Sequence, residues 1–562
     1  MVAVTGAQVL RDAVREARRG LSGAGVLLVG HQAGEAMVPV LVGVVIDRAV
    51  DGGGVGSLLF WLAVLAVDFA VLSLSYRYGA RAAAMASVRT DQRLRLRIAD
   101  RVLDPRGGAE VGRLPGALAG IAVADAQRVG ALGFALPAAL SAVAALVVAA
   151  VALLNISVPL GLLILLGTPP LLFLVHLLGK PLERRSGPEQ ERAARAAGVA
   201  ADLVTGVRVL KGIGAERAAV DRYRSTSRDA LGATLRATGA QAWYSGTVLA
   251  LNGLFLALVA LVGGRLAADG AMSVGQLVSA VGLAQFLIGP LEVFGWVNGR
   301  LAQARASAAR IAAVLSAPPA VGGEGEGDGE ATGGAVTVRG LRHGVLRDGL
   351  DLDVAAGAFV GVVATADEAV ALLDCLGREV DPEEGTVEVD GVGLDARAPA
   401  AARRAVLVAG HDALLFTGSV QENVLAAAPV NTDPGPAMRA AQADEVVAGL
   451  PAGASTEVGD RGTALSGGQR QRVALARAVA ADPAVLVLHD PTTAVDAVTE
   501  ARIADGLRAA RRGRTTVVVT ASPALLAVAD RVVLVEAGRV RADGTHADLL
   551  RDDARYRELV LG

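Results

Sequence analysis

The chain has 562 residues, 53% of them hydrophobic and 20% charged, and its mean hydropathy is +0.47. This length is too great for one hydrophobic core and the hydropathy is too high for a wholly soluble protein, so we expect at least two domains, one of them in a membrane. A formal net charge of −2 and an aromatic content of 3% provide no basic field and few stacking surfaces, which argues against nucleic acid as a partner.

Six long apolar runs occupy the N-terminal half. Each is close to the roughly 20 residues that a membrane-spanning helix requires, so we predict six spans near 25–46, 57–78, 131–154, 157–178, 243–264 and 273–296. The first run ends in Asp47-Arg48 rather than in a small-residue cleavage site, and we expect it to remain as a membrane anchor. Segments 80–104 and 188–238 have helical spacing of apolar residues, so the spanning helices should continue beyond the membrane.

Arginine placement predicts the orientation of these spans. Arg11, Arg15, Arg18 and Arg19 precede the first run, and segments 79–130 and 179–242 are rich in arginine, whereas 47–56, 155–156 and 265–272 hold few basic residues. Basic segments remain on the cytoplasmic side. We therefore expect a multi-pass protein of the (plasma) membrane with both termini and the C-terminal domain in the cytoplasm.

Composition changes sharply after the last apolar run. We predict a membrane domain over 1–315, a flexible Gly/Glu-rich linker over 316–334 and a soluble domain over 335–562. Strand-like runs at 359–363, 405–408, 485–488 and 515–519 alternate with helical segments rich in Ala and Arg. This alternation is typical of an α/β domain with a largely parallel sheet. The expected fold class is a multidomain membrane protein that joins an α-helical transmembrane domain to an α/β domain.

One glycine-containing motif in the soluble domain points to an anionic ligand. Residues 465–472 read Leu-Ser-Gly-Gly-Gln-Arg-Gln-Arg and should open a helix that runs to about Ala480. Gly467 and Gly468 permit close backbone approach, Ser466 can cap or donate, and a helix N-terminus favours an anion. A hydrophobic strand and Pro-Thr-Thr-Ala-Val-Asp at 491–496 follow, and this succession makes the motif highly specific.

With these motifs the chain resembles the ATP-binding cassette (ABC) transporters, specifically exporter-type half-transporters with a membrane domain fused ahead of a P-loop-NTPase-like cassette. Segments 207–216, 272–276 and 544–550 extend the resemblance over nearly the whole chain. The family implies a dimer with two composite sites for ATP and Mg²⁺, each formed by the phosphate loop of one cassette and the signature of the other. The resemblance thus implies that the following residues contact ATP bound mainly by a partner: Leu465, Ser466, Gly467, Gly468, Gln469 and Asp496.

The phosphate loop of the family is altered in this chain. The pattern G-x-x-x-x-G-K-S/T should follow the strand that ends at Val363, but residues 364–370 read Ala-Thr-Ala-Asp-Glu-Ala-Val, without lysine or a second glycine. Thr365 and Glu368 have the spacing of a capping box, and Asp367 adds a second carboxylate. We predict that this helix start is closed to anions, and we assign no substitute for the lysine.

Four further positions depart from the family pattern. His489 and Asp490 stand in place of the aspartate that orients magnesium and the glutamate that polarises water, His411 replaces the glutamine that senses magnesium, and Ser522 replaces a histidine that contacts the γ-phosphate. Imidazole is a poor magnesium partner, and aspartate is shorter than glutamate. We therefore predict no catalytic residue in this chain's own site. His411 and His489 are expected to be neighbours, but without a third ligand no metal site is predicted.

Two functional hypotheses follow. In the first, the chain is one subunit of a heterodimeric ATP-driven transporter, and ATPase activity arises only with a second half-transporter that has intact Walker A and B motifs. In the second, it is a nonhydrolysing regulatory or scaffolding membrane homodimer, in which the intact signature has no ligand. A soluble DNA-repair or translation-type cassette protein conflicts with the six apolar runs.

Charged and polar residues inside the apolar runs bear on the cargo. His31 and Glu35 lie one helical turn apart in the first run, and Asp68 lies within the second. Such groups are costly in a membrane unless they face a cavity or a partner, so they either contact a polar or cationic cargo or make interhelical contacts. Membrane lipid is an expected partner, and the sequence leaves three classes of cargo open: a small molecule, a peptide or a lipid-like compound. The resemblance implies efflux, although some members of this architecture import.

Overall fold

The computed structural model describes residues 4–50, 54–322, 331, 333–412, 414–459 and 462–562. The chain forms two compact units, one made of residues 1–98 and 116–316 and the other of residues 99–115 and 317–562. Residues 323–330 and 332 of the predicted Gly/Glu-rich linker over 316–334 lie outside the described residues, so the flexibility of this linker stays a prediction.

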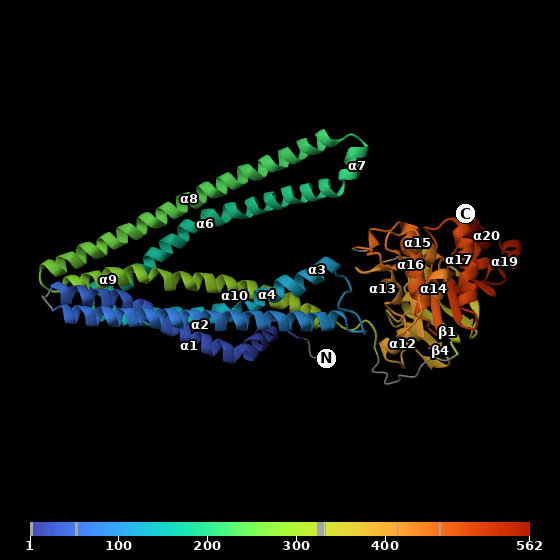
Figure 1. Cartoon of the computed structure of the whole chain (residues 1–562), viewed down its shortest axis with the longest axis horizontal. Helices are drawn as coiled ribbons and strands as arrows, with labels where there is room; N and C mark the ends of the chain where they lie inside the picture. Colours follow the sequence, from blue (N-terminus) through green and yellow to red (C-terminus); the bar gives the residue numbers. More distant parts are fainter. Residues whose placement is uncertain (1–3, 51–53, 323–330, 332, 413, 460–461) are drawn as a thin grey trace. The chain divides into compact units, whose positions relative to one another are not determined.

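The first unit is entirely helical (Figure 1) in the part that the structure describes. Its helices are α1 (Gly6–Val50), α2 (Val55–Val102), α3 (Pro115–Gly120), a π-helical turn (Ile121–Asp125), α4 (Ala126–Gly130), α5 (Leu132–Ile156), α6 (Val158–Thr205), α7 (Val207–Gly212), α8 (Glu216–Ala268), α9 (Val274–Phe286) and α10 (Ile288–Leu315). Six helical stretches are long and apolar enough to cross a membrane, and each overlaps one of the predicted spans to within one residue of its ends. The predicted helical extensions are confirmed, since α2, α6 and α8 continue far beyond their apolar portions.

The helices pack in a defined order. Helices α6 and α8 run side by side, and the short α7 connects their ends (Figure 1). Helix α1 packs against α5, α9 and α10. At the contact with α9 the backbones approach so closely that a Cβ on Gly43 would lie 2.2 Å from the Gly275 carbonyl oxygen. Asp47 at the end of α1 accepts a hydrogen bond from the Gly275 N–H at 2.7 Å, which fixes the start of α9.

The second unit contains two sheets. The first is antiparallel, in the order β2-β1-β4-β5, and the second has the order β10-β9-β3-β8-β7-β6, with parallel pairing throughout except between β9 and β10. The strands are β1 (Val336–His343), β2 (Leu346–Val354), β3 (Phe359–Val363), β4 (Glu384–Val389), β5 (Val392–Gly393), β6 (Val406–Ala409), β7 (Val485–His489), β8 (Thr515–Val519), β9 (Arg531–Glu536) and β10 (Arg539–Gly544). The predicted largely parallel sheet is confirmed, whereas the antiparallel sheet was not predicted.

Helices cover the parallel sheet, and alternating side chains divide it between two cores. In β7, Val485 and Val487 belong to the core shared with the antiparallel sheet, whereas Leu486 and Leu488 belong to the core shared with α16. The helices of this unit are α11 (Ala366–Leu376), α12 (Pro399–Ala405), α13 (Val420–Leu425), α14 (Gly435–Ala440), α15 (Ala443–Ala448), a 3₁₀ turn (Gly453–Ser455), α16 (Gly467–Ala480), α17 (Ala497–Ala510), α18 (Pro523–Ala527), α19 (His546–Asp552) and α20 (Ala554–Leu561). The two motif regions identified from the sequence lie at the starts of α11 and α16.

Candidate functional site

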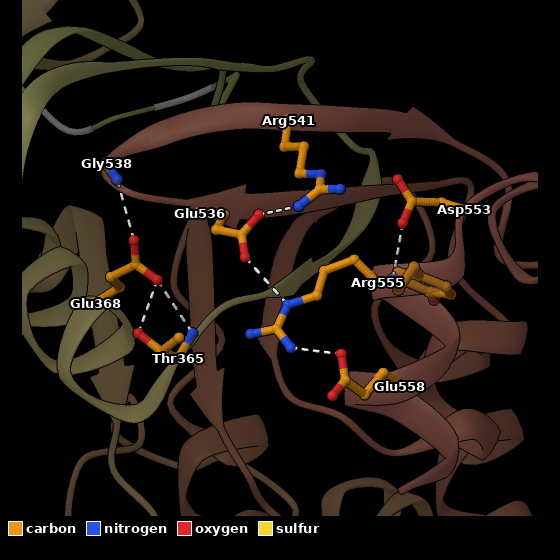
Figure 2. Close-up of polar contacts among 9 residues, drawn as sticks. Thr365, Glu368, Glu536, Gly538, Arg541, Asp553, Arg555 and Glu558 are labelled. Atoms are coloured by element: carbon orange, nitrogen blue, oxygen red, sulfur yellow. Dashed lines mark hydrogen bonds and ion pairs between the residues drawn. The ribbon is translucent and has the colours of Figure 1, made fainter.

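The start of α11 is the place where the sequence resemblance implies the phosphate loop. Strand β3 ends at Val363, Thr365 is the N-cap residue, and Glu368 completes the predicted capping box. Glu368 Oε2 accepts hydrogen bonds from the Thr365 backbone N–H at 3.3 Å and from the Thr365 hydroxyl at 2.7 Å (Figure 2). The side chain of Glu368 therefore turns back onto the start of its own helix.

Glu368 also joins this helix to the hairpin between β9 and β10. Its second oxygen, Oε1, accepts a hydrogen bond from the Gly538 backbone N–H at 3.0 Å, and the residue is only 5% exposed. Figure 2 shows the carboxylate between the helix start and the hairpin. Because three donors satisfy this buried carboxylate, the chain fastens α11 to the hairpin with a side chain of its own.

The hairpin itself is anchored to the C-terminal helix. Arg541 and Arg555 both donate to the carboxylate of Glu536, the latter from Nε at 3.0 Å, and Arg555 also donates to Glu558 at 2.5 Å (Figure 2). Hydrogen bonds from Arg541 and then Arg555 hold the pKa of Glu536 below its usual range. The ion pairs thus steady the turn that carries Gly538.

A nucleotide phosphate would meet unfavourable charge at the start of α11. Residues 364–370 contain two acidic side chains and no lysine or arginine, and Asp367 is exposed beside the buried Glu368. Phosphate binding at a helix start relies on available amides and a positive field, which carboxylates oppose. These residues do not fit a phosphate group, and we assign no catalytic step to them.

The signature motif forms the start of α16, as predicted. The Ser466 backbone N–H donates to Gln469 Oε1 at 2.8 Å, and Ser466 Oγ accepts from the Gln469 N–H at 3.3 Å. Helices α11 and α16 therefore both begin with a capping box. The difference that matters for an anion is charge, because Glu368 places a buried carboxylate at one helix start and Gln469 places a neutral amide at the other.

Hydrogen bonds join the signature helix to the loop at 491–496. Gln471, 8% exposed, donates from Nε2 to Thr493 Oγ1 at 2.7 Å and accepts at Oε1 from the Ala494 N–H at 2.8 Å. A Cβ on Gly468 would lie 2.5 Å from the Ala494 carbonyl oxygen, whereas one on Gly467 would lie 3.6 Å from the Ala494 side chain. Glycine at 468 is thus required for this close approach, and glycine at 467 leaves open surface.

Asp496 ends this loop and is exposed. It is the N-cap of α17 and accepts a hydrogen bond from the Thr499 N–H at 3.0 Å, which lowers the pKa of Asp496. The Asp496 carboxylate therefore has a structural role within this chain, as the cap of α17. Its position beside the signature also leaves it accessible from outside.

His489 and Asp490 lie together at the end of β7. His489 Nε2 is 3.8 Å from Asp490 Oδ2, and the His489 ring centroid is 5.3 Å from that of His411, with the rings edge to face. The predicted proximity of the two histidines is confirmed. Burial lowers the pKa of His489, which favours the neutral imidazole. Within the described ranges, no group of three or more His, Cys, Asp or Glu residues is arranged to hold a metal ion.

Ser522 takes part in a small hydrogen-bonded group. Its Oγ accepts from the Leu525 N–H at 3.3 Å as the N-cap of α18 and donates to Glu500 Oε1 at 2.8 Å. The hydroxyl of Thr492 donates to the same oxygen at 2.6 Å. Glu500 therefore connects Ser522 to the loop that follows His489 and Asp490.

A second candidate site is a cavity of about 520 Å³ in the membrane unit. His31 and Glu35 both line it, and His31 Nε2 lies 3.6 Å from Glu35 Oε2. Asp68 is not among the lining residues. It approaches α1 at Gly34, where a Cβ would lie 3.2 Å from Asp68 Oδ1, and its Oδ2 is buried without a hydrogen-bond partner in the described part of the chain. The structure thus brings together two of the three predicted cargo contacts.

Comparison with known proteins assigns the family. A family model described as ABC transporter transmembrane region matches residues 21–291, and one described as ABC transporter matches residues 371–493. An ATP-dependent lipid A-core flippase of Xylella fastidiosa is 30% identical over 408 residues, which cover 71% of this chain and 69% of the flippase. The chain belongs to the ABC transporter family. This ABC chain is a half-transporter in which a membrane domain and an ATP-binding domain are fused. It is an integral membrane protein. ABC cassettes generally use ATP and Mg²⁺.

Two further relatives define the extent of the similarity. A multidrug efflux ATP-binding/permease protein of Mycobacterium tuberculosis is 34% identical over 446 residues, or 78% of this ABC chain, but the chain spans only 37% of that protein's length. The structure of a bacterial Atm1-family ABC exporter with ATP bound has a TM-score of 0.74 over 96% of this chain and 97% of its own, at 23% identity. The predicted exporter-type fold is confirmed.

Several residues of these sites were not identified from the sequence. Gln471, Glu500 and Gly538 act through partners that are distant along the chain, so no local pattern marks them. For Gln471 a partial signal exists, because a glutamine two residues beyond the signature lies on the first turns of a predicted helix. Its partner in the next loop becomes visible only when the sheet brings the two segments together.

Proposed function

We propose that this chain is one subunit of a heterodimeric ATP-driven ABC exporter. In this proposal it supplies its signature to ATP held at the partner's phosphate loop, while its own phosphate-loop site does not hydrolyse ATP. The observation that carries the proposal is the contrast between two helix starts. The buried carboxylate of Glu368 occupies the start of α11, whereas the start of α16 offers Ser466 and two glycines.

The signature side retains what a composite site needs. Ser466 and Asp496 are exposed, and Gln471 holds the loop at 491–496 against α16. Fixed donors aimed at a phosphate stabilise developing negative charge more than mobile ones. The partner would then provide the phosphate loop, the magnesium ligand and the glutamate that polarises water.

This chain's own phosphate-loop site lacks the magnesium ligand and the glutamate that polarises water. His489 is a poor magnesium ligand, Asp490 has a shorter side chain than glutamate, and Ser522 is engaged with Glu500. His411 is adjacent to His489 rather than supplying an amide oxygen for magnesium. The matched segment of the cassette model begins at residue 371, beyond the altered stretch 364–370. All four changes are in keeping with a site that binds no catalytic magnesium.

Relatives suggest the direction and the class of cargo. The proteins compared above are named as a multidrug efflux protein and a lipid A-core flippase. We therefore propose outward movement of an amphipathic small molecule or a lipid-like compound.

The experiment is to purify the tagged chain from its native membrane in mild detergent and to identify any protein recovered at equal stoichiometry. A half-transporter with intact Walker motifs is expected, together with ATPase activity. Gly467→Trp, at the first residue of α16, should abolish that activity. The matched control is Ala366→Trp, at the first residue of α11, which should leave the rate nearly unchanged.

Two outcomes would contradict the proposal. An unchanged ATPase rate in Gly467→Trp would remove the signature from the catalytic site. Recovery of this chain alone, without ATPase activity, would favour the nonhydrolysing regulatory or scaffolding homodimer.

A further inference from the structure

The transmembrane cavity contains an arrangement of acceptors that indicates what it binds. We propose that it holds the positively charged group of a lipophilic organic cation, with Glu35 as the counter-charge. This inference rests on the proposed function, because it names the class of cargo for the exporter. It is carried by the cavity in the membrane unit and does not depend on how the ATP sites are shared.

The cavity has the size and position of a small-molecule site. Its volume of about 520 Å³ lies within the range of roughly 300–1,000 Å³ that is usual for ligand pockets. Helices α1, α2, α5, α9 and α10 all contribute to its walls. Apolar side chains form most of the lining. Three polar groups, His31, Gln32 and Glu35, lie together on α1, and Ser141 on α5 and Gln285 on α9 add two more.

The hydrogen bond of His31 fixes which of its nitrogens faces Glu35 as an acceptor. His31 Nδ1 lies 3.0 Å from the Leu72 carbonyl oxygen, and a carbonyl can only accept, so Nδ1 carries the hydrogen. In the neutral ring, Nε2 then presents a lone pair to Glu35 Oε2, 3.6 Å away. Two acceptors at this separation do not stabilise each other, and a donor or a positive charge beside them would be bound by both.

Gln32 adds a third acceptor to the same place. Its Nε2 donates to Glu35 Oε2 at 3.0 Å, so its own amide oxygen is the group left over. That oxygen, Oε1, is buried and has no hydrogen-bond partner among the described residues. Buried polar atoms are nearly always paired, so this unpaired acceptor in a residue beside the cavity would be satisfied by a donor or a positive charge that approaches it.

Aromatic rings complete a surface suited to a cation. Tyr76 packs against the His31 ring with centroids 4.9 Å apart, and Phe134 and Phe286 also line the cavity. Aromatic faces attract cations through their quadrupole, most strongly where water is excluded. Among the lining residues that the structure describes there is no lysine or arginine, so nothing in the wall would repel a cation or pair with an anionic headgroup.

Interhelical contact alone explains these groups less completely. The bond from His31 to the carbonyl of Leu72 does connect α1 to α2. Glu35, however, reaches no other helix through a hydrogen bond or ion pair in the described structure, its side chain is 46% exposed, and it lines the cavity. A carboxylate in an apolar segment that is neither buried nor paired across helices is expected to serve a ligand.

The test measures binding rather than transport. The full chain, with whichever partner accompanies it, is placed in lipid nanodiscs, and rhodamine 6G, a fluorescent lipophilic cation, is titrated by fluorescence anisotropy without ATP. Glu35→Gln, which keeps the shape and removes the charge, should raise the Kd about tenfold. Glu35→Asp should remain within about threefold of the original protein because the charge is kept.

A matched control removes an acidic group elsewhere in the same unit. Asp269, exposed after α8, does not line the cavity, and Asp269→Asn should leave the Kd unchanged. Equal thermal stability of the variants in the nanodisc would show that any loss in Glu35→Gln comes from the missing charge.

Three results would overturn the inference: no binding of rhodamine 6G to the original protein, equal Kd values for Glu35→Gln and Asp269→Asn, or displacement of the dye by an anionic phospholipid at lower concentration than by a second organic cation. Because the readout needs no ATP hydrolysis, these results are separate from failure of the proposed heterodimer. That failure would appear as a missing partner or as an ATPase rate insensitive to Gly467→Trp.

Discussion

Gln471 on the signature helix and Thr493 in the following loop are joined by a hydrogen bond of 2.7 Å between Nε2 and Oγ1. The same side chain accepts the Ala494 N–H, so one buried glutamine fixes the loop through both ends of its amide. Gln471 therefore holds the signature helix and the loop that ends at Asp496 together.

Replacing Gln471 by leucine should lower the ATPase rate of the assembled transporter about tenfold, because the loop loses its fixed position beside the signature. The measurement is the steady-state rate of the purified complex. Gln421→Leu, at an exposed glutamine on α13, serves as the control and should change little. Equal rates for the two variants would show that the hydrogen bonds of Gln471 to the loop have no functional role.

The two glycines of the signature should respond differently to alanine. Gly468→Ala forces a Cβ to 2.5 Å from the Ala494 carbonyl oxygen, whereas in Gly467→Ala the nearest atom is 3.6 Å away. We expect Gly468→Ala to destabilise this region by about 1–3 kcal/mol and Gly467→Ala to be nearly neutral. Thermal melting of the full chain in detergent compares them, and a lower melting temperature for Gly467→Ala would contradict the geometry.

Glu368 should be important for stability. Glu368→Ala removes the acceptor for the N–H groups of Thr365 and Gly538, and unpaired buried donors cost about 1–3 kcal/mol. A fall in the melting temperature of the cassette by several degrees is expected. Asp367→Ala at the neighbouring exposed position is the matched control. If both variants melt alike, the buried carboxylate does not hold α11 to the hairpin.

A glutamate at 490 should not create a hydrolytic site. In Asp490→Glu the carboxylate regains its length, but residues 364–370 still contain no lysine and Glu368 still occupies the helix start. The ATPase rate of the complex should stay within about twofold of the original, since the chemical step depends on positioned phosphates. A large increase would mean that ATP is bound beside residue 490.

The stability of the cassette should fall as the pH is lowered through the range in which His489 titrates. Burial lowers the pKa of His489 from its usual value of 6.5, so the neutral form is favoured in the folded state. Its contribution is present above pH 6.5 and is lost as the pH falls toward the lowered pKa. Between pH 7.5 and 5.5 the melting temperature of His489→Asn should therefore decrease less than that of the original protein. Parallel curves for the two proteins would exclude this role.

Local sequence patterns predicted much of the fold. The six apolar runs predicted six membrane-crossing stretches, and the runs at 359–363 and 515–519 coincide with β3 and β8. The capping box of Thr365 and Glu368 and the helix that begins at Gly467 were also predicted correctly. These features depend on residues that are close together along the chain, so a local pattern is enough to specify them.

The sequence alone determined that this chain crosses a membrane, carries an α/β cassette with the Leu-Ser-Gly-Gly-Gln motif and has no lysine in residues 364–370. Only the tertiary structure decided that Glu368 bonds to Gly538, that Gln471 clasps Thr493, and that His31 is turned by Leu72 toward Glu35. Each of these relationships joins side chains from different elements, and their distances follow from how sheets and helices pack. A one-dimensional pattern specifies periodicity and local hydrogen bonds, whereas the partner of a buried polar group is chosen by the packed core around it.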